Sequence, residues 1–259
     1  MDEFTAFMDT FRKQFGLDLS FYKRPQLERR VRSFQIRHQY PSLAALTRAL
    51  TDNRELQQQL IDKITIHVSD FFRNPERWQA LWTWVESLFS GEPLRIWSTA
   101  CATGEEAYTL AMLCEEHGRP YQIIATDVDE RVLFAAEQGV YREHQLRALS
   151  DEQKNRFFTS QDRVRGVWRI RPELQQSVRF QHHDLLGPEV PDEAPFHLIV
   201  CRNVLIYFTE EGKQQVIAKL ARALVPGGIL FVGSTEQFLN SRRFGLVNIA
   251  PFLYQRGSD

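Results

Sequence analysis

The 259-residue sequence has few cysteines, no long hydrophobic run and no excess of charge. Its three cysteines form no Cys-x-x-Cys pair, which argues against a disulfide or metal framework and favours a reduced, cytoplasmic setting. No apolar run reaches the roughly 18 residues of a membrane span, and the acidic N-terminus does not resemble a secretory signal. The net charge of −1 argues against nucleic-acid binding by the whole molecule. We expect a chain without membrane insertion, bound metal or nucleic acid.

Strand patterns are missing from residues 1–66, where apolar side chains recur at helical spacing. Pro25 suits the first turn of a second helix, Ser42 suits the N-cap of a third, and a fourth is expected to begin near Asp52. The sequence therefore predicts an all-helical N-terminal domain over residues 1–66.

From about residue 94, short apolar runs alternate with helical segments. Strands are predicted at 94–97, 121–126, 178–181, 197–201, 229–232 and, as a closing pair, within 246–255; helices are predicted at 105–116, 130–138 and 210–224. This alternation predicts a Rossmann-like α/β domain over residues 67–259, with a mostly parallel sheet covered on both faces. Residues 150–177 interrupt the rhythm, and the turn formers around Gly166 predict a small β insertion there.

Polar residues follow the predicted strands at the edge where an open α/β sheet binds its ligand. Arg202 and Asn203 end the apolar run 199–201 and cannot lie in a core without partners. Asp127 ends the second strand and is placed to accept hydrogen bonds from ribose hydroxyls, whereas Asp129 suits the N-cap of the next helix. After the third strand, Asp184 could bond an adenine amino group.

The loop after the first strand contains one glycine, Gly104, instead of the three that a pyrophosphate-binding loop uses. Glu105 and Glu106 follow it, and two carboxylates beside a phosphate would be repulsive. They suit a cationic ligand such as S-adenosylmethionine, although they could also merely favour the N-terminus of a helix. The neighbouring His182 and His183 point to opposite faces of a strand, which argues against a metal site.

Two further groups of polar residues lie nearer the N-terminus. Ser69, Asp70 and Arg73 flank the Phe71-Phe72 pair between the helical and α/β regions, a favoured place for a ligand. Basic residues cluster in the second helix and give that segment a local charge of about +5. This cluster consists of Lys23, Arg24, Arg29, Arg30, Arg32 and Arg37. It suits contact with nucleic acid, an acidic lipid surface or an acidic protein, or is simply a solvated helix face.

Several of these segments together resemble the CheR family, the chemotaxis receptor glutamate methyltransferases. The segments are Ser69-x-Phe71-Phe72-Arg73, Ile96-Trp97-Ser98-x-Ala100-Cys101-x-Thr103-Gly104-Glu105-Glu106-x-Tyr108, Ala125-Thr126-Asp127-x-Asp129, Cys201-Arg202-Asn203-Val204-x-Ile206-Tyr207-Phe208, Pro226-Gly227-Gly228 and Gly233-Ser234-Thr235-Glu236. They follow one another in order through nearly the whole chain. The resemblance implies a class I methyltransferase fold preceded by a helical domain.

The resemblance also implies an enzyme that uses S-adenosylmethionine to methylate glutamates of membrane chemoreceptors and releases S-adenosylhomocysteine. The implied cofactor-site residues are His67, Ser69, Arg73, Glu105, Glu106, Asp127, Asp184, Leu185, Arg202 and Asn203. Residues 1–66 would dock on the receptor's cytoplasmic coiled coil through Arg24, Arg29, Arg30, Arg32 and Arg37. Arg73 is expected to steer the substrate carboxylate, with help from Tyr207.

Two features depart from the family pattern. His67 stands where many members have asparagine. The β insertion docks a C-terminal receptor pentapeptide in some members through a glycine-rich loop, but here that loop holds only Gly166, so we expect this tether to be absent. No coiled-coil seam is evident, and we expect a monomer. Two alternatives remain open: a methyltransferase that acts on RNA or a small acid, and a non-enzymatic module that senses the cofactor.

Overall fold

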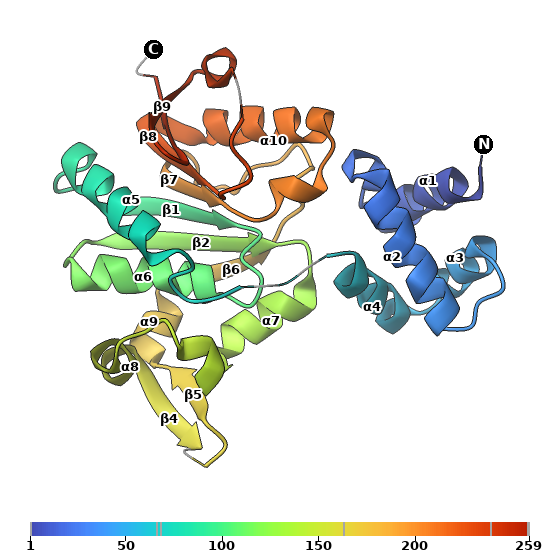
Figure 1. Ribbon diagram of the computed structural model, residues 1–259, viewed down its shortest axis with the longest axis horizontal. Helices are drawn as coiled ribbons and strands as arrows, with labels where there is room; N and C mark the ends of the chain where they lie inside the picture. The colour runs from blue at the N-terminus through green and yellow to red at the C-terminus, as the bar shows by residue number, and fades with distance from the viewer. Residues whose placement is uncertain (1, 66, 68, 163, 239, 258–259) are drawn as a thin grey trace. The chain divides into compact units, whose positions relative to one another are not determined.

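The computed structural model describes residues 2–65, 67, 69–162, 164–238 and 240–257 (Figure 1). The chain forms two compact units. Unit 1 comprises Met1–His67 and Tyr207–Val216, and unit 2 comprises Val68–Ile206 and Ile217–Asp259. Within the described ranges, no helix combines the length and the hydropathy that a bilayer crossing requires.

Unit 1 is helical, as predicted. Its helices are α1 (Glu3–Phe15), α2 (Arg24–Arg37), α3 (Leu43–Thr51) and α4 (Arg54–Ile64), with a short 3-10 helix η1 (Leu19–Phe21). Pro25 lies in the first turn of α2, and the Ser42 hydroxyl accepts the Ala45 N–H at 3.1 Å. The fourth helix starts at Arg54 because the Asn53 side chain caps it by accepting the Leu56 N–H.

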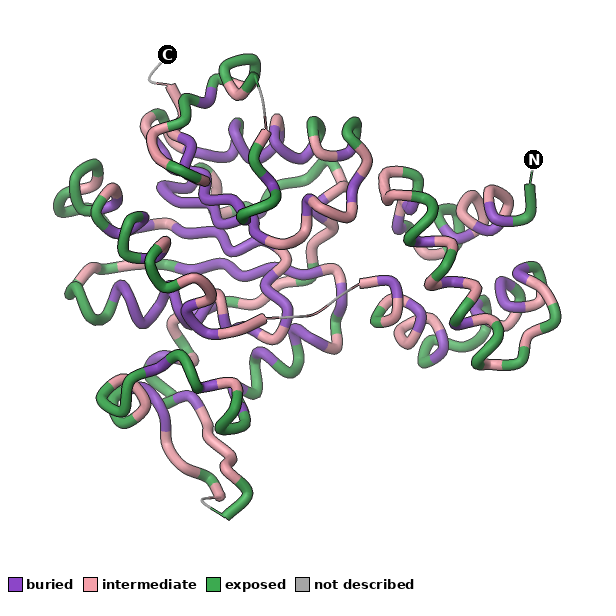
Figure 2. Tube along the Cα trace, viewed as in Figure 1, coloured by how far each residue is buried: buried purple, intermediate pink, exposed green. Residues whose placement is uncertain are grey.

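The core of unit 1 consists of the apolar residues whose spacing predicted the helices. Its buried members include Phe4, Phe7, Phe11, Leu27, Val31, Phe34, Leu43, Leu46, Leu50, Leu56, Leu60 and Ile64 (Figure 2). The segment 207–216 joins this unit through the start of α2: the Lys23 N–H donates to the Tyr207 carbonyl at 2.8 Å, and the Thr209 N–H donates to the Phe21 carbonyl at 2.7 Å. Thr209 also caps α10 (Glu210–Ala223) by accepting the Gly212 N–H.

Unit 2 contains a seven-stranded sheet in the order β6-β2-β1-β7-β8-β10-β9. Its strands are β1 (Leu94–Thr99), β2 (Tyr121–Asp127), β6 (Val178–His182), β7 (Phe196–Cys201), β8 (Leu224–Val232), β9 (Leu246–Ala250) and β10 (Leu253–Arg256). The first five strands of this order pair in parallel, whereas β10 pairs antiparallel with both β8 and β9. This arrangement confirms the predicted Rossmann-like sheet and its closing pair of strands.

Both faces of the sheet are buried. Alternate strand residues such as Ile96 and Leu198 belong to a core cluster that includes Trp78 and Leu81 of α5 (Pro75–Leu88) and Leu110 of α6 (Glu105–Glu116). Their neighbours on the strands, such as Ile199, are equally buried but point to the opposite face. The central strands are therefore buried along most of their length (Figure 2), and polar residues such as Thr99 and Asp127 lie at their carboxyl ends.

The interruption predicted at 150–177 is larger and more helical than expected. The hairpin β4 (Phe158–Asp162) and β5 (Val167–Ile170) is present, but β5 also pairs with β3 (Val140–Arg142), which lies outside the predicted range. Two short helices, α8 (Asp151–Phe157) and α9 (Pro172–Gln176), flank the hairpin. Ser150 and Gln153 form a capping box that starts α8, a local signal that the β prediction overlooked.

The last parallel strand also begins earlier than predicted. Helix α10 ends at Ala223 instead of 224, and β8 already includes Leu224 and Pro226. The register between β7 and β8 shifts between Phe196 and Leu198, opposite this stretch. Such an irregularity tolerates a proline that cannot donate to the sheet, so Pro226 does not mark the start of the strand.

Candidate active site at the carboxyl ends of the strands

Strained backbone gathers in the loops of unit 2 that the sequence singled out. Among the described residues, five of the eight non-glycine residues with positive φ lie in these loops. They are Phe72, Asn74, Ala100, Ala102 and Asn203. Such conformations cost of order 1–3 kcal/mol each and persist where packing over-determines them, often at functional sites.

The loop from β1 to α6 depends on Gly104. Its φ is +92°, and a Cβ there would lie 2.9 Å from the Cβ of Ala136, so no other residue fits without displacement. Tyr141 holds the same turn by donating its hydroxyl to the Thr103 carbonyl at 2.7 Å. The single glycine of this loop is therefore required because Ala136 packs closely against it. The following residues, Glu105 and Glu106, begin α6.

Asp127 lies at the tip of β2, as predicted, and is buried. Its carboxylate accepts the Ala102 N–H at 2.9 Å and the Asp129 N–H at 3.1 Å. The carboxylate thus holds the loops after β1 and β2 together. Asp129 caps α7 (Glu130–Gln138) by accepting the Arg131 N–H, which confirms its predicted capping role.

Glu106 and Arg202 face each other across the ends of β1 and β7. The Ser98 hydroxyl donates to one Glu106 carboxylate oxygen at 2.9 Å, and the other oxygen lies 3.6 Å from an Arg202 guanidinium nitrogen. Burial raises the pKa of Glu106 to about 7, although Arg202 and Ser98 oppose this rise. Burial also lowers the pKa of Arg202. Glu106 is therefore close to its titration point near neutral pH.

Arg202 connects the sheet to the loop of the F-F-R motif. Its side chain is 2% exposed and donates to the Arg73 carbonyl at 3.0 Å and to the Asn74 side chain at 3.1 Å. The guanidinium also lies over the rings of Trp78 and Phe231. Within the described residues its Nε–H has no acceptor. Arg202 was predicted to line the cofactor site, and in the structure most of its donors bind the protein itself.

Glu105 is buried and receives hydrogen bonds from three separate segments. The Thr103 hydroxyl lies 2.7 Å from its carboxylate, the Gln145 amide donates at 3.0 Å, and the Ser69 hydroxyl donates as well. Burial raises its pKa, while these hydrogen bonds oppose the rise. Two of the predicted cofactor-site residues, Ser69 and Glu105, are therefore in contact. Gln145 was not predicted to contact them, because it lies in a segment before the predicted insertion to which no role was assigned.

Asp184 and Leu185 form a tight turn after β6. The Asp184 side chain accepts the Leu186 N–H at 2.9 Å, and its carbonyl accepts the Gly187 N–H at 3.0 Å. The preceding residue, His183, donates its N–H to the Asp127 carbonyl at 3.0 Å. The predicted adenine and ribose contacts therefore lie on neighbouring strand ends that are hydrogen-bonded to each other.

Glu236 is a buried carboxylate to which the sequence analysis assigned no role. It accepts the N–H groups of Asn203 at 2.5 Å and Leu205 at 2.7 Å, and so holds the loop after β7 in its positive-φ conformation. Burial raises its pKa, and the backbone N–H groups lower it. In the sequence, Glu236 stands out only as the end of the motif Gly233-Ser234-Thr235-Glu236. Its position just after the last parallel strand, β8, was the signal that could have placed it at the carboxyl edge of the sheet.

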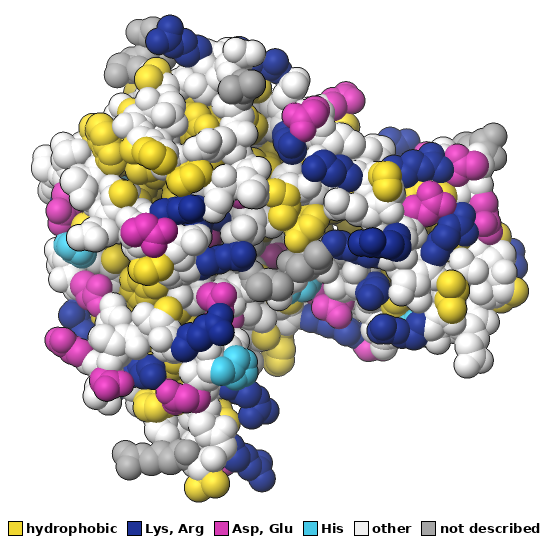
Figure 3. All heavy atoms as spheres, viewed as in Figure 1, with side chains coloured by type: hydrophobic (Ala, Val, Ile, Leu, Met, Phe, Trp, Pro, Cys, Tyr) yellow, Lys and Arg dark blue, Asp and Glu magenta, His cyan; other side chains and the backbone are white. Residues whose placement is uncertain are grey.

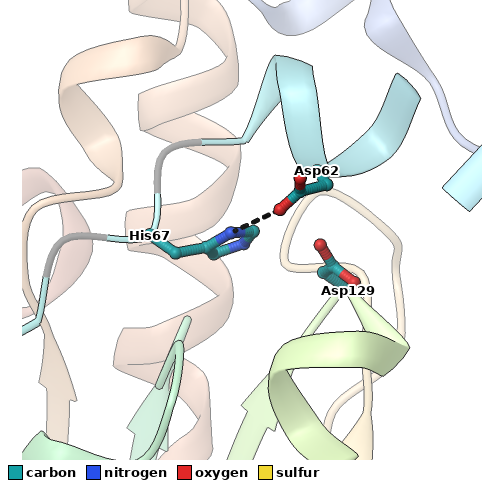
Figure 4. A group of neighbouring side chains, drawn as sticks. All are labelled: Asp62, His67 and Asp129. Carbon is teal, nitrogen blue, oxygen red and sulfur yellow. Dashed lines mark ion pairs between the residues drawn. The ribbon is translucent and has the colours of Figure 1, made fainter. Parts of the chain in front are cut away.

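The remaining predicted residues belong to unit 1. Nδ1 of His67 lies 3.6 Å from Asp62 of α4 (Figure 4). The ring of Tyr207 lies under the Arg30 guanidinium, 5.3 Å from its centre, and Arg30 also donates to the Ile64 carbonyl at 2.5 Å. Figure 3 shows basic and acidic side chains interleaved on unit 1.

The predicted docking arginines of α2 differ in their surroundings. Arg24 pairs with Asp2 at 2.6 Å, and Arg32 pairs with Glu28 at 2.8 Å. Arg29 and Arg37 are exposed and have no ion-pair partner within the described residues. Three of the five arginines are therefore engaged within unit 1, and two remain available to a partner.

The sheet edge of unit 2 suits a cationic ligand with hydroxyl groups. Three carboxyl groups surround the loop after β1: those of Glu105 and Asp127 are buried, and the side chain of Glu106 is 14% exposed. Asp127 already uses the Ala102 N–H, and only Gly104 provides glycine in this loop, so the edge offers little to a pyrophosphate. A sulfonium or ammonium group would instead favour the ionised form of Glu106.

Comparison with known proteins agrees with this chemistry. The family model "CheR methyltransferase, SAM binding domain" matches residues 67–252, and "CheR methyltransferase, all-alpha domain" matches residues 2–65. A chemotaxis protein methyltransferase of Listeria monocytogenes is 40% identical over 257 residues, which cover 97% of this chain and 96% of the relative. One of Escherichia coli is 35% identical over 196 residues, 73% of this chain and 68% of the relative.

Among solved structures, a TehB-like SAM-dependent methyltransferase from Corynebacterium glutamicum has a TM-score of 0.40 and 15% identity, and the match covers 70% of this chain and 93% of that one. The family match confirms the predicted class I methyltransferase fold and the predicted cofactor, S-adenosylmethionine. The chain therefore belongs to the CheR family of chemotaxis methyltransferases, with an all-helical domain followed by an S-adenosylmethionine-binding domain.

Proposed function

We propose that this chain transfers the methyl group of S-adenosylmethionine to glutamate side chains of chemoreceptors. The products are glutamate methyl esters and S-adenosylhomocysteine. The observation that carries the proposal is the largely buried acidic edge of unit 2, in which Glu105, Glu106 and Asp127 surround the loop after β1 in a chain of the CheR family. This edge suits the charge of the methyl donor, and the family supplies the chemotactic context.

The chemistry requires positioning more than proton transfer. A glutamate side chain has a pKa near 4.3 and is already a nucleophile at neutral pH. The bound cofactor supplies an electrophilic methyl group on a sulfonium sulfur. An acceptor oxygen forms a bond to this carbon while the carbon–sulfur bond breaks and its electron pair stays on sulfur. No proton moves, so no general base is needed, and alignment can contribute roughly 7–11 kcal/mol.

Arg73 is proposed to steer the acceptor carboxylate. Its backbone carbonyl is held by Arg202, and the neighbouring Asn74 adopts positive φ, so the loop that carries Arg73 is anchored at two points. Because the loop is already fixed, the Arg73 guanidinium can align the acceptor carboxylate without an entropic cost for ordering the loop in each turnover. Tyr207 is proposed to assist in placing the reacting groups.

The other cofactor contacts are proposed from the family resemblance. Asp127 would bind the ribose hydroxyls and Asp184 the adenine amino group. Glu105 and Glu106 would favour the positively charged end of the cofactor. The remaining proposed contacts are His67, Ser69, Leu185, Arg202 and Asn203. Since Arg202 already binds the Arg73 carbonyl and Asn74, we propose that it acts mainly by holding the site together.

Residues 1–66 are proposed to dock on the receptor, and residues 67–259 to carry out methyl transfer. Arg29 and Arg37 lie on one exposed side of α2, together with Ile36, which is 73% exposed. An apolar side chain flanked by arginines suits an acidic amphipathic helix of a receptor coiled coil. Arg24, Arg30 and Arg32 would contribute less because they already have partners in unit 1.

The pentapeptide tether is proposed to be absent. The turn between β4 and β5 has Gly166 at positive φ, and this is its only glycine. Calorimetric titration with a receptor C-terminal pentapeptide is expected to give no micromolar binding. Saturable heat at micromolar concentrations would contradict this proposal and leave the methyltransferase activity untouched.

The activity can be tested with methyl-labelled S-adenosylmethionine and receptor-bearing membranes. Base-labile release of labelled methanol from the receptor band is expected, because carboxyl methyl esters hydrolyse in base. Receptors whose methylation-site glutamates are changed to alanine provide the matched control. Transfer to RNA or a small acid instead would favour another methyltransferase, and tight cofactor binding without transfer would favour a sensing module.

A further inference from the structure

Lys219 is a buried lysine behind the proposed cofactor site. It lies in α10, is 5% exposed, and donates from Nζ to the Gly187 carbonyl at 2.8 Å. The same Nζ lies 3.5 Å from Nε2 of His183. Both partners belong to the segment that follows β6, so one ammonium group contacts this segment on either side of Asp184 and Leu185.

The segment it contacts is the tight turn 184–187. Inside this turn, Asp184 accepts the N–H groups of Leu186 and Gly187 through its side chain and its carbonyl. His183 is fixed from the other side, because its ring packs edge-on against Trp97 of β1 at 5.4 Å between ring centres. The Lys219 ammonium thus holds the turn to α10, while His183 holds its start to β1 and β2.

The charge of Lys219 is costly to keep in this position. Burial lowers its pKa from 10.5 to about 8, while Asp184, Cys201 and Glu189 oppose the shift. Burial, together with the charges of Lys219 and His182, lowers the pKa of His183 to about 4, so His183 is neutral at pH 7. Burial raises the pKa of Cys201, which keeps it a thiol. Among these groups, the one expected to change charge near pH 8 is Lys219.

This depressed pKa means that Lys219 reduces the stability of the fold below pH 8. The folded state binds the proton less tightly than the unfolded chain, and the resulting penalty disappears as the pH rises from about 8 to 10.5. A methionine of similar length would avoid it. The charge therefore does not add to the stability of the fold, whereas the ammonium group that carries it donates to the Gly187 carbonyl beside Asp184 and Leu185.

We propose that Lys219 is a positioning residue for the cofactor, which acts by holding the turn 184–187 in its binding conformation. The inference rests on the proposed assignment of Asp184 and Leu185 to the cofactor site. The charged ammonium makes a stronger hydrogen bond to the Gly187 carbonyl than a neutral amine would, and it attracts the Asp184 carboxylate. Loss of the charge should loosen the turn and weaken cofactor binding.

The test compares wild type with Lys219→Met in binding of S-adenosylhomocysteine, measured by calorimetry from pH 6.5 to 9.5. At pH 7 the variant is expected to bind about tenfold more weakly, the size expected for loss of one charge-assisted hydrogen bond. The ratio of the two dissociation constants should fall towards one as the pH rises through 8. Titration of the ligand's own amino group affects both proteins and cancels in this ratio.

Hydrogen exchange provides a second measurement that needs no ligand. The protection factors of the Leu186 and Gly187 amides are expected to decrease in Lys219→Met, and in wild type as the pH rises through 8. Arg222→Met, which removes a positive charge from an exposed position of the same helix, is the matched control and should change neither quantity. The melting temperature of Lys219→Met should equal or exceed that of wild type.

Unchanged affinity of folded Lys219→Met would overturn the inference, even if its turn exchanged faster. A pH-independent protection factor in wild type would overturn it even if the variant did not fold. Neither measurement involves a receptor. Failure of receptor methylation would therefore count against the proposed function alone, while normal methylation with unchanged affinity would count against the role of Lys219 alone.

Discussion

Charged residues are held in opposite ways at the sheet edge of unit 2 and along α2 of unit 1. At the sheet edge, Glu106, Arg202 and Glu236 are mostly buried and bind fixed protein groups. Along α2, Arg24 and Arg32 make ion pairs at the surface. Buried charges carry a large desolvation cost, whereas exposed pairs contribute only about 0–1 kcal/mol. Burying these charges is expected to lower the free energy of unfolding of unit 2, but it fixes the side chains at the proposed site. Substitution of the exposed arginines of α2 should change the free energy of unfolding only slightly.

The strongest test of this comparison is Arg202→Met. The change leaves the Glu106 carboxylate without its counter-ion and removes the donor to the Arg73 carbonyl and the Asn74 side chain. A decrease of about 3–5 kcal/mol in the free energy of unfolding is expected. Urea denaturation at pH 7.5 measures it, with exposed Arg222→Met as the control that should change by less than about 0.5 kcal/mol. A loss below about 1 kcal/mol would mean that Arg202 does not hold the site together.

Arg73→Ala tests the proposed steering role at the same edge. Turnover on receptor glutamates is expected to fall about 100-fold, because misplacing the acceptor by roughly 1 Å can have an effect of this size. Affinity for S-adenosylhomocysteine should fall much less. Arg95→Ala, near the amino end of β1, is the control. Near wild-type methylation by Arg73→Ala would show that another group positions the acceptor.

The pKa of Glu106 near 7 gives the site a pH dependence with a definite sign. As the pH rises from 6 to 8 the carboxyl group ionises, and preference for the sulfonium cofactor over its neutral thioether product should increase by up to about tenfold. Because this pKa lies above the ordinary 4.5, the contribution of Glu106 to folding stability decreases as the pH rises from about 4.5 to 7. The ratio of the two dissociation constants measures the preference. A ratio in Glu106→Gln that varied with pH as in wild type would exclude Glu106 as the cause.

The smallest effect is expected from the double change Arg29→Glu and Arg37→Glu in α2. Both side chains are exposed, so the free energy of unfolding should change by less than about 0.5 kcal/mol. Receptor methylation should fall about fivefold at low ionic strength, and less at high salt, because the interaction is a screened surface attraction. The same change at Arg12 and Arg48, on other helices of unit 1, provides the control. Equal loss of cofactor binding would indicate misfolding instead.

Most of the fold could be predicted because its signals are local. Pro25, Ser42 and Thr209 mark helix starts by their own chemistry, and the apolar strands of unit 2 are recognisable without partners. The errors have local causes as well. The capping box of Ser150 and Gln153 was overlooked. The strand predicted at 229–232 begins at Leu224, because an irregularity between β7 and β8 accommodates Pro226.

For the proposed site, the sequence indicated which residues end the strands, but not which residues they contact. Asp127 and Arg202 lie at the ends of strands in a recognisable sheet, so the sequence placed them at the carboxyl edge of this sheet, where we propose that the cofactor binds. Their partners come from distant parts of the chain: Gln145 lies 40 residues from Glu105, and Glu236 lies 31 residues from Leu205. No spacing rule connects such pairs, because the contact exists only after the strands and loops have been brought together.

Sequence by itself determined the helical and α/β regions, the acidic character of the sheet edge and the resemblance to a methyltransferase family, because periodicity and motif spacing are properties of the linear chain. Tertiary structure decided which charges are buried, which arginines of α2 remain available, and that Lys219 and Glu236 support the loops after β6 and β7. Burial and hydrogen bonding depend on residues far apart in the chain, and they set the protonation and orientation on which the chemistry depends.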